Sequence, residues 1–305
     1  MPALEAVVVP TEVVEKDLSQ TKACRQYFGG TGYHQYVQYR SQGDTRFTIN
    51  GSRHYKTPYG ALPSVTTILS ATQGNKASLE RWNKKNPGKR EEAAARGTAV
   101  HARMEHYLLG ERKFEYNEIV EPFWDGLPEK LDKFEDVIWA ENPVDNHYSW
   151  TIGGDGVSRV WHPGVNENET WGWAGAPDII ATYKGKIILG DLKTSNGLYY
   201  GKWPGPETPR DEYGMRRAGF IKYQKCCMQL AAYHMAIEET ISIKPDVHMI
   251  LVATQTRAQT FAIQGRTIQK YKEKWLQAVE KYYTEFHNKT EIDMEAVDGD
   301  KDIKR

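Results

Sequence analysis

The chain has 305 residues, 39% of them hydrophobic, so it can bury a sizeable core in one large domain or two small ones. Forty basic residues balance forty acidic ones, so the net charge points to neither a nucleic acid nor a membrane, and any anionic partner must meet a local patch. No run of about 18 apolar residues and no targeting signal are present, so we expect a soluble protein that is not exported.

The cysteines add a further restriction. Cys24 and the adjacent Cys226 and Cys227 are the only three in the chain. They lack the spacing of a zinc site, an iron–sulfur cluster or a disulfide framework. We therefore expect a reducing, intracellular compartment and no iron–sulfur cluster.

The N-terminal part is predicted to start with a poorly ordered arm over residues 1–45, which have no clear periodicity. Residues 46–51 are typical of a strand that enters a turn, and residues 62–69 begin with a helix-start signal. A basic segment over residues 79–90 carries Trp82. We interpret this segment as a solvated helix end, with a DNA contact as the alternative.

Residues 91–109 are rich in helix formers and carry His101 in the middle of the predicted helix. Glu105, one turn later, shares the face of His101, whereas His106 is rotated by roughly 140°. The pattern therefore does not fit the zinc peptidase motif, which needs two histidines four residues apart. Taken alone, a helical histidine is more often a core residue than a metal ligand.

The central part is predicted to contain a helix over residues 118–136, a strand over 136–144 that includes Glu141, and then mostly antiparallel strands. Two β-prone runs, 178–183 and 186–191, flank Lys184-Gly185, which has the length of a two-residue hairpin turn. With that turn, the numbers of paired residues sum to 369. Asp178 then lies opposite Asp191, with Cβ atoms roughly 5 Å apart.

Because side chains alternate along a strand, Lys193 is expected on the same core-facing side as Asp191. Two carboxylates this close repel each other unless one is protonated or a cation lies between them. A hard divalent ion such as Mg²⁺ or Mn²⁺ would solve this problem. Two alternatives remain: an ordinary hairpin whose aspartates cap loops, or a three-residue loop that changes the register.

The C-terminal part begins with a Pro- and Gly-rich loop over residues 197–214, next to the acidic pair and therefore a candidate for contact with a substrate. A long helix is predicted over 216–239. A solvated face explains the two lysines of its polar stripe well, but the Gln and Tyr one turn apart less well. Strands over 246–254 and 260–264, a helix over 267–286 and a mobile acidic tail over 291–305 follow. The polar stripe consists of Lys222, Lys225, Gln229 and Tyr233.

Four motifs in order give the chain a resemblance to the RecB-like branch of the PD-(D/E)xK nuclease superfamily. They are Gly97-x-x-x-His101, Gly175-x-Pro177-Asp178, Asp191-x-Lys193 and Gln229-x-x-x-Tyr233. Within that branch, segments 62–69 and 79–82 and the histidine helix are similar to the mitochondrial genome maintenance exonuclease and to phage exonucleases. The resemblance spans roughly residues 46–265.

The resemblance implies an α/β (α+β) fold with a restriction-endonuclease-like core, in which a central mixed sheet with an antiparallel hairpin is flanked by helices. It implies a single nuclease domain over 46–290. It also implies site residues: metal ligands for Mg²⁺ or Mn²⁺ from His101, Asp178, Asp191 and the Leu192 carbonyl, catalysis by Asp178, Asp191 and Lys193, and DNA contacts from Gln229, Tyr233, Lys225 and Lys222. Glu105 and Glu141 would take supporting roles.

The function expected from this resemblance is a metal-dependent DNA exonuclease in recombination, repair or phage DNA processing, acting in the cytoplasm and, if phage-encoded, in that of the host. The partner would be single- or double-stranded DNA ends and not a membrane, and a recombination partner protein or a homo-oligomer stays open. An endonuclease or flap-type nuclease with the same centre is the first alternative. A DNA-binding recombination factor without catalysis is the second. No phosphate loop of the G-x-x-x-x-G-K-[ST] type is present in the sequence, so we expect a stand-alone nuclease domain.

Overall fold

The computed structural model describes residues 46–49, 51–57, 60–74, 76–140, 158–160, 171–241 and 243–287. The predicted N-terminal arm, the acidic tail and Glu141 lie outside these residues. Within them, no helix combines the length and the apolar content that crossing a bilayer requires.

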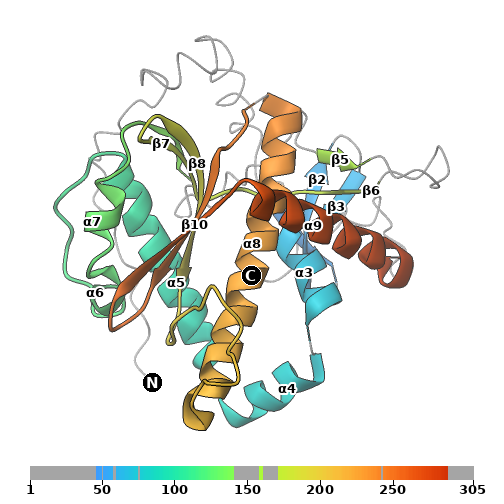
Figure 1. Cartoon of the computed structure of the whole chain (residues 1–305), viewed down its shortest axis with the longest axis horizontal. Helices are drawn as coiled ribbons and strands as arrows, with labels where there is room; N and C mark the ends of the chain where they lie inside the picture. The colour runs from blue at the N-terminus through green and yellow to red at the C-terminus, as the bar shows by residue number, and fades with distance from the viewer. Residues whose placement is uncertain are drawn as a thin grey trace.

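A five-stranded mixed sheet forms the centre of the fold (Figure 1). The strand order is β10-β9-β8-β7-β4, where only the β8–β9 pair is parallel. Every residue of β9 is buried, as expected for a strand with helices over both faces of the sheet. The strands are β4 (Val137–Ala140), β7 (Ile179–Tyr183), β8 (Lys186–Thr194), β9 (Val247–Ala253) and β10 (Ala258–Gln264).

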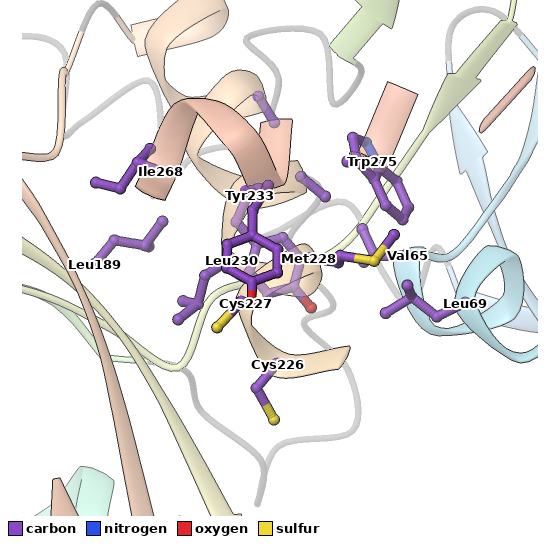
Figure 2. Packing of buried hydrophobic residues seen from close by; sticks show 14 of the residues in the cluster. Val65, Leu69, Leu189, Cys226, Cys227, Met228, Leu230, Tyr233, Ile268 and Trp275 are labelled. Carbon is purple, nitrogen blue, oxygen red and sulfur yellow. The ribbon is translucent and has the colours of Figure 1, made fainter. Parts of the chain in front are cut away.

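Helices cover the sheet on two sides (Figure 1). One layer holds α5 (Lys89–Leu108), α6 (Glu121–Trp124) and α7 (Pro128–Leu131), and the other holds α3 (Val65–Gln73), α8 (Arg210–Ile241) and α9 (Arg266–Glu285). Alternation along β8 serves both layers, since Ile188 packs with the first and Leu189 with the second. Figure 2 shows the core of the second layer, to which Leu189 of β8, Leu230 of α8 and Trp275 of α9 all belong.

A smaller antiparallel sheet precedes α3. It consists of β1 (Arg46–Ile49), β2 (Ser52–Thr57) and β3 (Gly60–Pro63), and it leads directly to Ser64. The Ser64 hydroxyl accepts a hydrogen bond from the Thr67 amide at 3.0 Å, which caps the predicted helix start. A separate pair joins β5 (Ser158–Val160) to β6 (Trp171–Trp173). The basic segment is divided between the end of α4 (Lys76–Lys85) and the start of α5, and Trp82 of α4 is exposed, as in a solvent-facing helix.

The hairpin of β7 and β8 has the predicted turn and register. Ile179 pairs with Gly190 and Tyr183 with Lys186, so the residue numbers sum to 369 and the three-residue loop is excluded. Lys184 and Gly185 both have positive φ, at 50° and 68°. Their amides donate to the Glu135 carboxylate at 2.8 and 3.3 Å, which helps to hold a lysine in a conformation that side chains disfavour.

The prediction of one helix over residues 118–136 is wrong. The segment forms only the single turns α6 and α7, separated at Gly126, whose φ is 75°. Pro128 opens α7 and cannot continue the preceding helix, because a proline lacks the amide hydrogen that helix needs. The other long helices form within a few residues of their predicted bounds, although α8 begins at Arg210, six residues before the predicted start.

Candidate functional site

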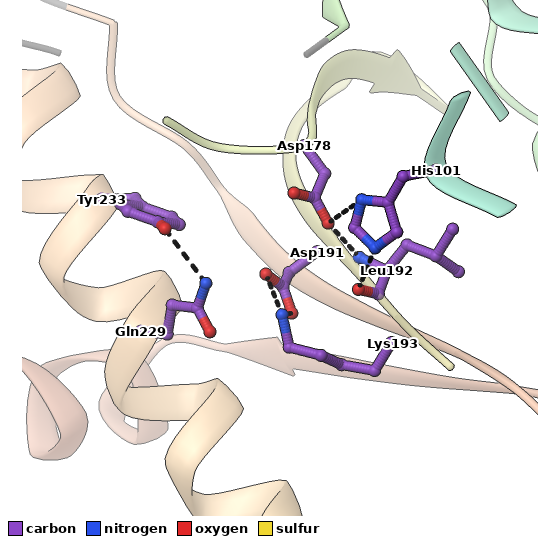
Figure 3. Close-up of polar contacts among 7 residues, drawn as sticks. All are labelled: His101, Asp178, Asp191, Leu192, Lys193, Gln229 and Tyr233. Carbon is purple, nitrogen blue, oxygen red and sulfur yellow. Dashed lines mark hydrogen bonds and ion pairs between the residues drawn. The ribbon is translucent and has the colours of Figure 1, made fainter. Parts of the chain in front are cut away.

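The site lies where β8 runs on beyond its partner β7. The ladder between these strands ends at Ile179 and Gly190, while β8 continues to Thr194. The backbone of Leu192 therefore has no strand partner on that edge. Its amide donates instead to Asp178 Oδ2 at 2.6 Å, and its carbonyl lies 3.0 Å from His101 Nε2 (Figure 3).

Two buried carboxylates and an amine meet at this edge. Asp178 is 4% exposed and Asp191 is fully buried. The Lys193 ammonium donates a hydrogen bond to Asp191 Oδ1 at 2.7 Å. It also lies 2.6 Å from Oδ2, but this second contact lacks hydrogen-bond geometry, so Oδ2 is a buried oxygen without a hydrogen-bond partner. The predicted grouping of Asp178, Asp191 and Lys193 is present.

Burial dominates the electrostatics of this pair. It raises the pKa of Asp191 to about 7; Lys193 opposes that rise and the nearby Asp178 charge adds to it. Burial is the largest single influence on Lys193 and would lower its pKa, but the charges of Asp191, Cys226 and Asp178 and the hydrogen bond to Asp191 together raise the pKa of the amine well above its usual value. The short contacts favour an ammonium facing a carboxylate, since each charge then offsets the desolvation of the other.

His101 reaches the same edge from α5. Its Nδ1 lies 3.6 Å from Asp178 Oδ2, while Nε2 is in hydrogen-bond contact with the Leu192 carbonyl. One turn earlier, a Cβ on Gly97 would lie 3.7 Å from the Thr194 hydroxyl, so α5 passes close to the end of β8 there. The side chain of His101 is 20% exposed, which differs from a histidine enclosed in a core. Glu105, one turn later, is buried.

The donor set fits a hard divalent ion. Carboxylate and carbonyl oxygens are the ligands that Mg²⁺ and Mn²⁺ prefer, and the buried Asp191 Oδ2 has no hydrogen-bond partner, although the Lys193 ammonium lies 2.6 Å from it. As the side chains stand, no three His, Cys, Asp or Glu in the described part of the chain already converge as a metal-binding group. The internal contacts explain this, because Asp178 is turned to the Leu192 amide and Asp191 to Lys193.

Gln229 and Tyr233 of α8 face this edge from the other side (Figure 3). The Gln229 amide nitrogen donates to the Tyr233 hydroxyl at 3.0 Å, and both side chains are buried. Burial raises the pKa of Tyr233 well above its usual value, and the Asp191 charge raises it further. This pair is therefore not part of a solvated face. A Cβ on Gly175 would lie 2.6 Å from the Tyr233 ring, so the close approach requires a glycine there.

The two lysines of the predicted stripe differ. Lys222 donates to the Ser195 hydroxyl at 3.1 Å and its ammonium lies 5.7 Å from the centre of the Tyr199 ring. Its side chain is exposed overall, but the enclosed ammonium has a lowered pKa because it is partly desolvated. Lys225 is partly exposed. Only Lys222 is thus tied to the segment that follows Lys193.

Two residues at the site were missed by the sequence patterns. Tyr199 and Cys226 are buried within reach of the charges of Lys193 and Asp191, and burial raises the pKa of both groups. Cys226 lies three residues before Gln229 on α8, so helical spacing could have found it. Tyr199 lies in an irregular loop, where no periodicity gives a signal.

No protein-family model matches this chain, and no curated protein matches it either.

Proposed function

We propose that this chain is a metal-dependent deoxyribonuclease that hydrolyses phosphodiester bonds at DNA ends. The observation that carries the proposal is the meeting of buried Asp178 and Asp191 with Lys193 and His101 around the Leu192 backbone. A mixed sheet between helical layers supports a restriction-endonuclease-like core and membership of the RecB-like PD-(D/E)xK nucleases.

Mg²⁺ or Mn²⁺ would be held by Asp178, Asp191, the Leu192 carbonyl and His101. When bound, the ion supplies neutralisation of phosphate charge and a lowered pKa of water. Without a cation, the two buried carboxylates would repel the negatively charged phosphodiester. The positive charge of the ion would remove this repulsion.

The chain's own residues supply the remaining chemistry. The Lys193 ammonium has three donors, of which the contact with Asp191 leaves others for the attacking water or a phosphate oxygen. The Gln229 amide and the Tyr233 hydroxyl form a hydrogen-bonded pair that can hold the strand beside the acids. Lys193 would thus offset the negative charge of the phosphate, while Gln229 and Tyr233 would position the DNA strand.

The test compares end-labelled linear DNA with closed circular DNA of the same sequence, in Mg²⁺, in Mn²⁺ and in EDTA. We expect labelled mononucleotides or short products from linear DNA, no cutting of circles, and no reaction in EDTA. Asp125→Asn, a change at an exposed carboxylate on the surface, is the matched control for Asp178→Asn.

The outcomes separate the competing functions. Cleavage of closed circles would replace the exonuclease with an endonuclease that uses the same centre. DNA binding without cleavage under every metal condition would indicate a recombination factor that lacks catalysis. Activity that is unchanged in Lys193→Ala would contradict the role assigned to that amine.

A further inference from the structure

An exposed tryptophan stands on the loop that leaves the site. Trp203 is 49% exposed, and it lies between the end of β8 and the start of α8. Its ring packs edge-to-face against Phe220 of α8, with the ring centroids 5.5 Å apart. The Arg217 guanidinium lies 5.7 Å from the centroid of the same ring. A large aromatic side chain is thus held at the surface beside a cation.

The loop around Trp203 is fixed against α8, as Figure 1 shows for the segment between β8 and the first half of that helix. Gly219 allows the closest approach, because a Cβ there would lie 2.4 Å from the Leu198 carbonyl. Arg216 lies over the Tyr200 ring at 5.5 Å and pairs with Glu212 at 2.7 Å. The position of the tryptophan is therefore set by packing, which lowers the entropy lost when a ligand stacks on it.

The charge of this region suits an anionic partner. Residues 196–225 contain six basic and three acidic residues, although the whole chain is neutral. Among the described residues, no carboxylate forms an ion pair with Arg217, whereas Arg216 is engaged by Glu212. An aromatic ring beside a guanidinium that no carboxylate of the described residues neutralises can stack a nucleobase and contact its phosphate.

The surface is continuous with the candidate site. The loop starts directly after Lys193 and Thr194, and Lys222 of α8 is hydrogen-bonded back to Ser195. Phe220 precedes Gln229 by nine residues on the same helix, which corresponds to about 14 Å. That length matches about four stacked nucleotides, or fewer in an extended strand.

We propose that Trp203 and Arg217, supported by Phe220, form a stacking surface for the bases of an unpaired DNA strand whose end lies at Asp191 and Lys193. Bases in a duplex cannot stack on an external ring, so the surface selects single-stranded ends. This inference rests on the proposed function, because it names the form of DNA that the same site receives.

The experiment measures binding without cleavage, in EDTA, so that it does not depend on catalysis. The probes are fluorescein-labelled oligo-dT of 3 and 12 nucleotides and a 12-base-pair duplex. The variants are Trp203→Ala, Trp203→Phe, which keeps an aromatic ring, and Tyr116→Ala, a control at an aromatic residue that is 81% exposed on a different segment.

For Trp203→Ala we expect about tenfold weaker binding of the 12-mer, less than about twofold change for the 3-mer, and no change for the duplex. Trp203→Phe should retain most of the affinity, and Tyr116→Ala all of it. Equal binding of the 12-mer by the wild type and Trp203→Ala would overturn the inference, as would a wild type that binds neither single strand.

The two proposals fail in different ways. Tryptophan-dependent binding of the 12-mer by a protein that never cleaves DNA would leave the stacking surface standing and remove the nuclease. Cleavage of linear DNA that is unaffected by Trp203→Ala, with unchanged binding, would leave the nuclease and remove the stacking surface.

Discussion

Helix α8 covers two buried polar clusters on one face of the sheet. At the site, Asp191 and Lys193 of β8 face Gln229 and Tyr233. Farther along, His234 of α8 meets His248 of β9, with Nδ1 and Nε2 2.8 Å apart. In the β8–β9 ladder, His248 pairs with Leu189 and Ile250 pairs with Asp191. His248 is therefore two residues from the partner of Asp191 and faces the same side of the sheet. Both clusters are therefore covered by α8, and they lie on the neighbouring, paired strands β8 and β9.

The two clusters differ in whether their buried groups are charged. Burial lowers the pKa of His248 to about 2 and that of His234 to about 4, with Lys272 adding to both shifts, so the two rings are neutral and hydrogen-bonded at neutral pH. The charged partners, Glu238 and Lys272, meet at the rim, 2.9 Å apart. At the site, by contrast, a carboxylate is fully buried.

A neutral hydrogen-bonded pair stabilises a fold with little electrostatic cost, whereas buried carboxylates weaken it unless something compensates them. The histidine pair is thus expected to serve stability. The acidic cluster is expected to serve chemistry, and mutations should separate the two.

The largest expected effect comes from neutralising an acid at the site. Asp178→Asn should reduce DNA cleavage by at least about a hundredfold, because charge relief at the phosphate is lost, while DNA binding is largely kept. Product formation on end-labelled DNA and binding in EDTA measure the two properties. If cleavage and DNA binding were lost in parallel and the unfolding midpoint fell, Asp178 would have a structural role. The acidic cluster would then not differ in role from the histidine pair.

Removal of a histidine should have the reverse signature. His248→Ala leaves a cavity and an unpaired buried His234 nitrogen, so we expect a loss of about 2–4 kcal/mol in the free energy of unfolding. Cleavage per folded molecule should not change. Urea unfolding, with Thr260→Ala on the neighbouring strand as control, gives the stability. A variant as stable as the wild type would contradict this role.

The histidine pair should also make the fold sensitive to acid. Both folded-state pKa values lie below the unfolded value of about 6.5, so the unfolded chain binds more protons in this range. Their contribution is complete above pH 6.5 and is lost as the pH falls toward 4, at about 1.4 kcal/mol per pH unit for each ring. A wild type and a His248→Leu variant with parallel stability curves between pH 7 and pH 4 would refute this.

The smallest effect is expected for Tyr233→Phe, which removes the hydroxyl that receives the Gln229 hydrogen bond. Cleavage should fall by only a few fold, through KM or kcat, because the ring still packs beside Gly175. Steady-state kinetics on a labelled oligonucleotide measure the change. Unchanged values of both constants would leave Tyr233 with a packing role alone.

The sequence could predict what local rules determine. The alternation of the two strands and the length of the Lys184-Gly185 turn were enough to predict the register, which the structure confirms up to the pair of Ile179 with Gly190, just before Asp178 and Asp191. Helical spacing was enough to bring Gln229 and Tyr233 to one face. Local rules failed over residues 118–136, where composition favours a helix but Gly126 and Pro128 divide it. They also could not reveal the position of Tyr199, since a loop acquires its contacts only from tertiary packing.

Long-range pairing lay beyond the sequence as well. The contact between His234 and His248 depends on the parallel pairing of β8 with β9, which no nearby pattern specifies. The same holds for the Leu192 backbone, which is open to Asp178 and His101 only because β8 is longer than β7. The histidine contact and the open Leu192 backbone therefore depend on which strands pair, and this pairing cannot be read from the residues of one strand.

Isothermal titration calorimetry with Mn²⁺, on the wild-type protein and on Asp191→Asn, tests most directly whether the acidic cluster is a metal centre. We predict saturable binding by the wild type, at least about tenfold weaker binding by Asp191→Asn, and wild-type behaviour for Asp125→Asn. Equal affinity in the wild type and Asp191→Asn, or no Mn²⁺ binding by the wild type, would contradict the account.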